Sequence, residues 1–176
     1  TVLEIARLDA GMGEIRRQPV ALSELLSELE AQLRPLAAQK GLALRVRALS
    51  VTVDAEPVVL RRMLINLMAN AIRYTPRGGV LLAARRRGGA VSVEVWDTGV
   101  GIAQAEHERV FDDFYRGRAT DAAGASGLGL GLAIVQRLSR RAGLPVSLHS
   151  RLERGTVFKL LLQPWADGAA PPAIKG

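Results

Sequence analysis

The sequence predicts a two-layer α/β sandwich, in which helices pack on one face of a mixed, mostly antiparallel sheet. Three observations lead to this fold class. Helix-like and strand-like segments follow one another along the 176 residues. The helix-like segments are apolar on one side only, as expected for helices that cover a sheet. Hydrophobic residues make up 48% of the chain and aromatic residues only 4%, so the core between the layers is expected to be aliphatic.

Three helices are expected from apolar spacing and from stop signals. The first runs from about Leu22 to Gln39 and ends at Gly41, because glycine is favoured directly after a helix. The second covers about Pro57 to Tyr74 and carries the most regular apolar stripe of the chain. The third runs from Leu128 to Ala142. Residues 1–9 have the spacing of the end of a further helix.

Strands are expected where apolar and polar residues alternate over short runs. In chain order they are Leu42–Ala48, Val51–Val53, Val80–Arg86, Ala90–Asp97, Pro145–Ser150 and Thr156–Leu162. Turns are expected at Gly88-Gly89 and around Arg154-Gly155, and Pro19 is assigned to a linker. The stretch from Thr98 to Ser126 has no sustained pattern, except for a short amphipathic piece near residues 104–110. A loop of this length inside a compact domain is usually functional or mobile.

Composition excludes several classes of function. The net charge is +7, but the arginines are scattered and not interleaved with aromatic residues, which argues against nucleic-acid binding. The absence of cysteine excludes disulfides and thiolate metal sites. His107 and His149 lack the spacing of metal ligands and are interpreted as surface residues. No run approaches the roughly 20 apolar residues of a membrane span. The chain starts at Thr1, so we expect a fragment of a longer protein.

A polar stripe on the second predicted helix is the first candidate site. Asn66, Asn70 and Arg73 stand at intervals of four and three residues and therefore share one face. Asparagine is a poor helix former, so two of them in a helix interior need a reason. An ordinary solvated face is the commoner explanation for such spacing. The functional alternative is a row of amide oxygens and one cation, directed at a hard metal ion such as Mg²⁺ and at phosphates.

Asp97 and the glycines around it form a second candidate site. Strand alternation places Asp97 at the end of an apolar, core-facing row, where a carboxylate needs a hydrogen-bond donor. It either caps the turn that follows or accepts a hydrogen bond from a ligand amino group. Gly99 and Gly101 would let backbone approach a ligand closely. The glycines within Gly127–Leu132 precede a helix, where phosphate can meet free N–H groups, but they match neither a P-loop nor a dinucleotide fingerprint.

Five segments follow one another in a fixed order: Asn66–Pro76, Asp97–Ile102, Phe111–Arg116, Gly127–Val135 and Arg154–Thr156. In this order and spacing they resemble the asparagine box, the first glycine box, the phenylalanine box, the second glycine box and the last short box of the catalytic domain of sensor histidine kinases, within the GHKL ATPase superfamily. The resemblance covers about Leu22 to Gln163 and implies the Bergerat-type ATP-binding fold.

The resemblance implies how the phosphates of ATP would be bound. Asn70 would bind the Mg²⁺ ion that bridges the phosphates, and Asn66 would support the same wall. Arg73 and Arg116 would stabilise the phosphates, with Arg116 reaching the γ-phosphate. Phosphoryl transfer depends mainly on positioning and charge neutralisation, which these groups would supply.

The resemblance also implies the adenine side and the lid. Asp97 would accept the adenine amino group, Thr156 would help through water, and Tyr74 would lie against the adenine. Residues 102–126 would form a lid that Phe111 and Phe114 hold against the core or the partner helix. The other nucleotide-binding residues would be Gly99, Gly101, Ile102, Gly127, Leu128, Gly129, Leu130 and Gly131.

By the same resemblance, residues 1–15 are the end of a dimerisation and phosphoacceptor helix with its linker, residues 16–163 the ATP-binding catalytic domain, and residues 164–176 a Pro/Ala/Gly-rich linker tail. The phosphorylated histidine would lie upstream, so this fragment alone is expected to lack autophosphorylation. The implied partners are its own dimerisation helix, in a homodimeric parent, and a response-regulator receiver domain, without nucleic acid. The domain is expected in the cytoplasm, whether or not the parent protein is anchored in a membrane.

A protein histidine kinase is therefore the function that the sequence favours. Hydrolytic members of the superfamily, such as DNA gyrase, carry a Glu at the position of Asn66, and that Glu activates water. Asn66 cannot act as a base, which suits a domain that holds ATP for a histidine. Two alternatives share the motifs: an ATP-sensing module without kinase activity and a serine kinase of the anti-sigma type. Residues 1–15 favour the histidine kinase, and a nucleic-acid binder is a distant third.

Overall fold

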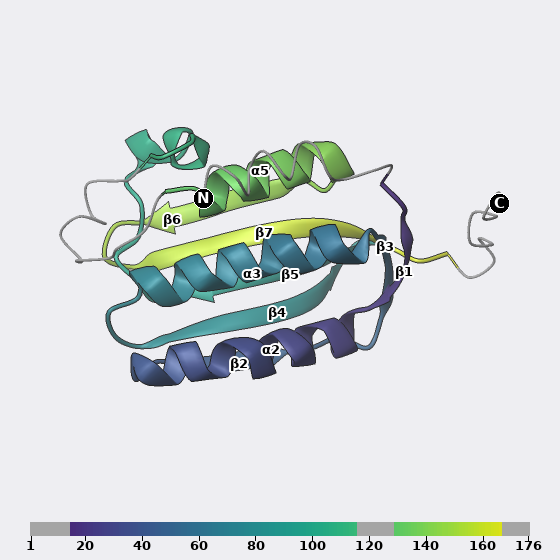
Figure 1. Cartoon of the computed structure of the whole chain (residues 1–176), viewed down its shortest axis with the longest axis horizontal. Helices are drawn as coiled ribbons and strands as arrows, with labels where there is room; N and C mark the ends of the chain where they lie inside the picture. The colour runs from purple at the N-terminus through teal and green to yellow at the C-terminus, as the bar shows by residue number, and fades with distance from the viewer. Residues whose placement is uncertain (1–14, 116–128, 167–176) are drawn as a thin grey trace.

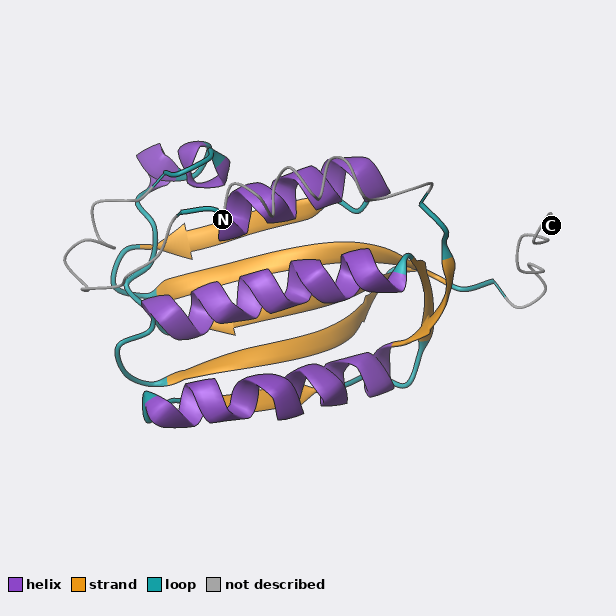
Figure 2. Ribbon diagram, in the orientation of Figure 1, coloured by secondary structure: helices purple, strands orange, loops and turns teal. Residues whose placement is uncertain are grey.

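The computed structural model describes residues 15–115 and 129–166. Within these ranges, three α-helices cover one face of a seven-stranded sheet (Figures 1 and 2), so the predicted two-layer sandwich is confirmed. The helices are α2 (Leu22–Gln39), α3 (Pro57–Tyr74) and α5 (Gly131–Ala142). The strands are β1 (Gln18–Ala21), β2 (Ala43–Arg47), β3 (Thr52–Ala55), β4 (Gly79–Arg87), β5 (Ala90–Asp97), β6 (Val146–Arg151) and β7 (Gly155–Pro164). Two short 3₁₀ turns, Gln104–Glu106 and Arg109–Phe111, occupy the predicted amphipathic piece.

The strands follow the order β1-β3-β7-β5-β4-β2, and β6 pairs with β7 outside this path. β2 and β4 are parallel, because the chain crosses back over the sheet through α3 before it enters β4. The other paired strands are antiparallel, as the sequence predicts. β7 is the longest strand, with 10 residues, and it pairs with β3, β5 and β6.

α3 lies in the middle of the helix layer, between α2 and α5 (Figure 1). It begins after Glu56, whose carboxylate accepts hydrogen bonds from Val58 N (3.3 Å) and Val59 N (2.7 Å), with Pro57 in the first turn. Its apolar stripe faces the sheet. The buried residues of α3 are Val59, Leu60, Met63, Leu64, Leu67, Met68, Ala71 and Ile72.

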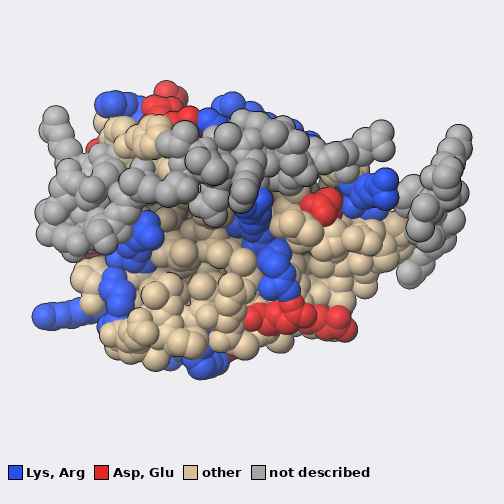
Figure 3. Space-filling view, viewed as in Figure 1, with Lys and Arg blue, Asp and Glu red and all other residues tan. Residues whose placement is uncertain are grey.

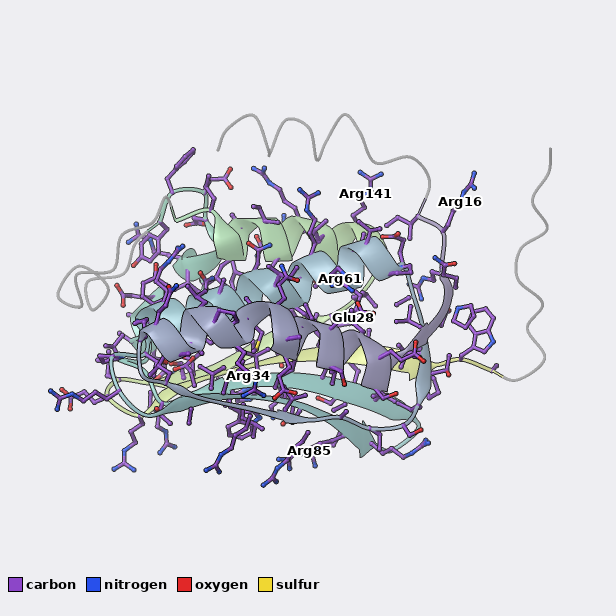
Figure 4. All side chains as sticks on the ribbon, turned by 60° about the horizontal axis from the view of Figure 1, so that its bottom comes forward. Arg16, Glu28, Arg34, Arg61, Arg85 and Arg141 are labelled. Carbon is purple, nitrogen blue, oxygen red and sulfur yellow. The ribbon has the colours of Figure 1, made fainter. Side chains whose placement is uncertain are left out.

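α2 lies beside α3 and is held to it by packing and by charge. The five leucines predicted for its inner face are all buried: Leu22, Leu25, Leu26, Leu29 and Leu33. On the outside, Arg61 of α3 and Glu28 of α2 point toward each other and form an ion pair (Figure 4). On the face drawn in Figure 3, Lys and Arg lie in separate spots, some of them beside Asp or Glu, as the scattered arginines predict.

The chain ends differ from the prediction. Pro19 lies in β1 rather than in a linker, because β1 is an edge strand, where a missing N–H costs no ladder bond. β7 continues beyond its predicted end at Leu162 to Pro164, where it pairs with β3. α5 begins at Gly131, after Gly129 has turned the backbone to φ +69°. Residues 1–14 and 167–176 lie outside the described residues. Among residues 15–115 and 129–166, none of the helices has the length and apolar character of a membrane span.

The sheet face opposite the helices carries one buried carboxylate. Glu94 is fully buried there and accepts hydrogen bonds from Ser92 Oγ (3.2 Å) and Trp96 Nε1 (2.9 Å). Arg85 and Arg87 of β4 lie 3.7 Å from its two oxygens, and Arg85 points away from the helices (Figure 4). The flanking cations and donors offset the cost of burying this charge.

We expect Glu94→Ala to lower the free energy of unfolding by about 1–3 kcal/mol, because the buried Ser92 hydroxyl and the Trp96 indole lose their acceptor. Urea denaturation measures this loss. Glu94→Gln keeps an acceptor oxygen and should lose less, while Glu108→Ala, at an exposed glutamate, should change little. Equal losses in Glu94→Ala and Glu108→Ala would show that the buried network contributes nothing to stability.

Candidate functional site

The predicted site residues come from four elements that meet at one end of the sheet. β5 ends there at Asp97, β7 begins there at Gly155, α3 ends there at Tyr74 and α5 begins there at Gly131. In Figure 1 these ends lie together on the left. The antiparallel pairing of β5 with β7, in which Trp96 faces Val157, explains why the end of one strand adjoins the start of the other.

Asp97 is a largely buried carboxylate with two backbone donors. Its Oδ1 accepts hydrogen bonds from Gly99 N (2.8 Å) and Thr156 N (3.1 Å). Burial raises the pKa of the Asp97 carboxyl to about 6, although the hydrogen bonds from Gly99 and Thr156 act in the opposite direction. Among the described residues, both hydrogen bonds to this carboxylate fall on Oδ1. Such a group can accept a further donor on Oδ2 and changes its charge near neutral pH.

Ser150 extends the network around Asp97, and sequence reasoning missed it. Its Oγ accepts a hydrogen bond from Ile102 N (2.8 Å) and lies 2.9 Å from Thr156 Oγ1 and 3.0 Å from Gly155 O. Ser150 therefore joins the loop after β5 to the start of β7. A signal was present in the sequence: Ser150 ends a core-facing row after Val146 and Leu148, the same pattern that singled out Asp97.

The end of α3 is in direct contact with the loop that follows Asp97. Tyr74 O accepts a hydrogen bond from Val100 N (3.2 Å). A Cβ on Gly99 would lie only 2.4 Å from Tyr74 O and 2.8 Å from Asp97 Oδ1, so residue 99 must be glycine for this approach. Gly101 is also required, since its φ is +70° and a Cβ there would lie 2.0 Å from Arg151 O.

The two asparagines of α3 face the start of α5. A Cβ on Gly131 would lie 3.1 Å from Asn70 Nδ2, 3.2 Å from Asn70 Oδ1 and 3.5 Å from Asn66 Oδ1. Asn66 Nδ2 donates to Arg62 O (2.9 Å), so its oxygen is the atom nearer to α5. The first turn of a helix has free N–H groups and a partial positive charge. Amide oxygens and a helix N-terminus therefore lie side by side.

One turn of α3 connects the asparagine cluster with the carboxylate. Asn70 and Tyr74 are four residues apart and share a face, while Tyr74 O contacts the loop after Asp97. The exposed side chain of Arg73 lies in the same turn. Gly129 and Leu130 directly precede Gly131 in the chain, and Leu130 is buried. Arg116, Gly127 and Leu128 lie outside the described residues.

The segment before residue 116 packs on the same end of the sheet. Phe111 meets Phe158 of β7 edge-on, with ring centroids 6.3 Å apart, whereas Phe114 is 55% exposed. Tyr115 hydroxyl donates to Glu106 Oε1 (2.8 Å). A Cβ on Gly129 would lie 2.7 Å from Tyr115 O, so the described residues on either side of segment 116–128 lie close together.

His107 and His149 take no part in this arrangement. One ring nitrogen of His107 lies 3.2 Å from Ile102 O, and His149 is exposed on β6. Within residues 15–115 and 129–166, no three His, Cys, Asp or Glu side chains are grouped as a metal site would require. A divalent ion at this end of the sheet would need ligands of other kinds, such as amide oxygens and the ligand's own oxygens.

Curated relatives of the chain are sensor kinases. An uncharacterised sensor-like histidine kinase of Rhizobium meliloti (strain 1021) is 33% identical over 173 residues, which is 97% of this chain and 33% of that protein. The histidine-protein kinase BarA of Escherichia coli (strain K12) is 31% identical over 165 residues, 89% of this chain and 18% of BarA. SenX3 of Mycobacterium tuberculosis (strain ATCC 25618 / H37Rv) is 32% identical over 163 residues. The chain spans 18–40% of the length of these relatives.

Solved structures agree on the fold. Full-length ShkA in complex with AMPPNP superposes with a TM-score of 0.79 and 36% identity, over 97% of this chain and 35% of ShkA. The catalytic domain of histidine kinase ThkA superposes with a TM-score of 0.71 and 23% identity, over 84% of this chain and 95% of that domain, which supports the fold alone. The family described as "Histidine kinase-, DNA gyrase B-, and HSP90-like ATPase" matches residues 55–165, from the last residue of β3 to the residue after β7. The chain belongs to this ATPase family.

Proposed function

We propose that this chain is the catalytic domain of a sensor histidine kinase, which binds Mg-ATP and transfers the γ-phosphate to a histidine on a dimerisation helix. The observation that supports this proposal most directly is that one turn of α3 joins two clusters. One is the largely buried carboxylate of Asp97, and the other is the pair of amides of Asn66 and Asn70. The first cluster suits a purine and the second suits metal-bound phosphates. ShkA, solved with AMPPNP, supports a nucleotide of this kind.

At the purine end, Asp97 Oδ2 would accept the amino group of adenine, since Gly99 N and Thr156 N already occupy Oδ1. Thr156 and Ser150 would hold a water molecule beside the ring, because their hydroxyls lie 2.9 Å apart. Tyr74 would lie against the adenine. Its position is set by the contact of its carbonyl with Val100 and Gly99.

At the phosphate end, Asn70 Oδ1 would bind the magnesium ion and Asn66 would support it. Bound there, the ion would neutralise charge that develops on the phosphates. The first turn of α5 from Gly131 would donate backbone N–H groups, and Gly129 and Leu130 would shape its approach. Arg73 lies in the same turn of α3, and Arg116, Gly127 and Leu128 complete the proposed set.

Asn66 argues for transfer rather than hydrolysis. Its amide nitrogen donates to Arg62 O, and an amide oxygen cannot remove a proton from water. Water attack at this position therefore lacks a general base. We propose that the nucleophile is a histidine on the dimerisation helix of the parent protein, which acts as a homodimer. A response-regulator receiver domain then accepts the phosphoryl group. In this proposal the catalytic domain works in the cytoplasm.

We expect Asp97→Asn to weaken nucleotide binding about 10- to 100-fold, because one charge-assisted hydrogen bond contributes about 1.5–3 kcal/mol. Calorimetry with ADP measures the change. Asp54→Asn is the matched control, since Asp54 is also partly buried but lies in β3, at the opposite end of the sheet (Figure 1). Unchanged affinity in a folded Asp97→Asn protein would remove Asp97 from the binding site.

The same carboxyl sets a pH dependence. Adenine binding needs the charged form, so ADP affinity should be highest above about pH 6 and fall as the pH drops through the raised pKa of Asp97.

The free energy of unfolding should depend on pH in the opposite direction. The folded carboxyl holds its proton more tightly than its ordinary pKa of 3.8 implies, so the contribution of Asp97 to the free energy of unfolding falls as pH rises from about 4 to about 6. Both effects should be absent from Asp97→Asn.

Asn70→Asp should disturb binding of Mg-ATP far more than binding of adenosine. The added charge changes the metal ligand and repels phosphate, but it does not touch the purine end of the site. Calorimetry with each ligand separates the two effects, and Gln32→Glu, an exposed change from amide to carboxylate on α2, is the control. Equal losses for both ligands would show that Asn70 does not meet the metal.

The reaction is tested by mixing this chain with a dimerisation helix that carries the acceptor histidine, together with labelled Mg-ATP. We expect acid-labile label on that helix and none when Asp97→Asn replaces the wild type at an ATP concentration below its Kd. Acid-stable label on a serine would support the serine-kinase alternative. ATP binding without any transfer would support the ATP-sensing module.

A further inference from the structure

The C-terminal end of α3 has an unusually complete set of hydrogen-bond partners. The last four carbonyls of a helix have no partner within the helix, and they commonly turn to water. In α3 all four accept a hydrogen bond from within the protein. The pairs are Thr75 Oγ1 to Ala71 O (2.6 Å), Lys40 Nζ to Ile72 O (2.8 Å) and to Arg73 O (2.7 Å), and Val100 N to Tyr74 O (3.2 Å).

Lys40 is the only charged donor among these four partners. It directly follows the last residue of α2, the helix that lies beside α3. Its backbone is fixed there by the bond from Lys40 N to Ala37 O (3.1 Å), and Gly41 then turns the chain toward β2 with φ +66°. The side chain crosses to α3, where its ammonium meets the negative end of the helix dipole. Partial burial, and then the nearby charge of Arg73, lower the pKa of Lys40.

The residues that Lys40 contacts belong to the proposed nucleotide site. Arg73 O is one of its two acceptors, Tyr74 follows directly, and Asn70 lies one turn earlier on α3. Tyr74 in turn contacts Gly99 and Val100, next to Asp97. The position of this single turn therefore affects both the purine end and the phosphate end of the site.

We propose that Lys40 is a positioning residue for nucleotide binding, which holds the last turn of α3 through the carbonyls of Ile72 and Arg73. This inference rests on the proposed function. Without the ammonium, both carbonyls lose their partner and the last turn is free to fray, because only Thr75 and Val100 remain bound to it. Arg73 and Tyr74 would then sample several positions, and binding would carry the entropic cost of ordering them.

Three variants test this role. Lys40→Met keeps the aliphatic stem but removes the charge and the donors, Lys40→Arg keeps both, and Lys159→Met removes a lysine from β7 on the sheet face away from the helices. We expect Lys40→Met to bind ADP about 3- to 10-fold more weakly, as expected for the loss of one or two hydrogen bonds. Lys40→Arg should recover most of the affinity, and Lys159→Met should match the wild type.

A role limited to stability would change none of these affinities, because calorimetry is carried out well below the unfolding temperature of each variant. Hydrogen exchange at Val100 N gives a second readout, since this amide is bonded to Tyr74 O and should exchange faster in Lys40→Met. Should Lys40→Met not fold, Lys40→Gln, which keeps a neutral donor, takes its place with an intermediate loss expected.

The outcomes separate the two proposals. A wild-type chain that binds neither ADP nor Mg-ATP would overturn the proposed function. A wild-type chain that binds ADP, together with a folded Lys40→Met that binds it equally well and keeps Val100 N protected, would overturn the role of Lys40 alone. Weaker binding in Lys40→Met that Lys40→Arg fails to recover would also overturn it, because the N–H groups of the arginine guanidinium can donate to the same two carbonyls.

Discussion

The burial of the apolar stripe of α3 against the sheet is the constraint on which the rest of the structure depends. Eight residues of this helix are buried, and the helix lies between α2 and α5. Rotation by one residue would expose leucines to water at a cost of about 1.5–3 kcal/mol for each large side chain. Because the stripe fixes the rotation, the polar side with Asn66 and Asn70 has to face the first turn of α5.

The same constraint fixes where α3 ends relative to β5. Its last turn meets the loop after Asp97 through Tyr74 O, and the approach is so close that only glycine fits at residue 99. A carboxylate at this place would be costly without donors, and Gly99 N and Thr156 N supply them. They do not fully offset burial, so the pKa of Asp97 stays raised, to about 6. Since both hydrogen bonds to Asp97 among the described residues fall on Oδ1, its Oδ2 is suited to a ligand that brings a hydrogen-bond donor.

The two halves of the site are held by different kinds of interaction. At the carboxylate end, the positions are set by the pairing of β5 with β7 and by the hydrogen bond between the Ser150 and Thr156 hydroxyls. At the asparagine end, they are set by helix packing and by capping of α3, where Lys40 bonds two carbonyls. The family match, over residues 55–165, spans both halves of the site, whereas Lys40 precedes the matched residues.

Local patterns in the sequence predicted α2, α3 and most strands, and they singled out the residues of the candidate site. Apolar spacing and stop signals predicted the first and last residues of α2 and α3 correctly, and alternation placed Asp97 at the end of a core-facing row. Both properties depend on near neighbours along the chain. Pro19 was assigned wrongly, since only the finished sheet shows that β1 is an edge strand. Ser150 and Lys40 were missed for a related reason. Alternation could place Ser150 on the core side of β6, but it could not reveal the contact with Ile102 N, which lies 48 residues away. The carbonyls bound by Lys40 lie 32 and 33 residues away, and only tertiary packing brings such distant donors and acceptors within hydrogen-bonding distance.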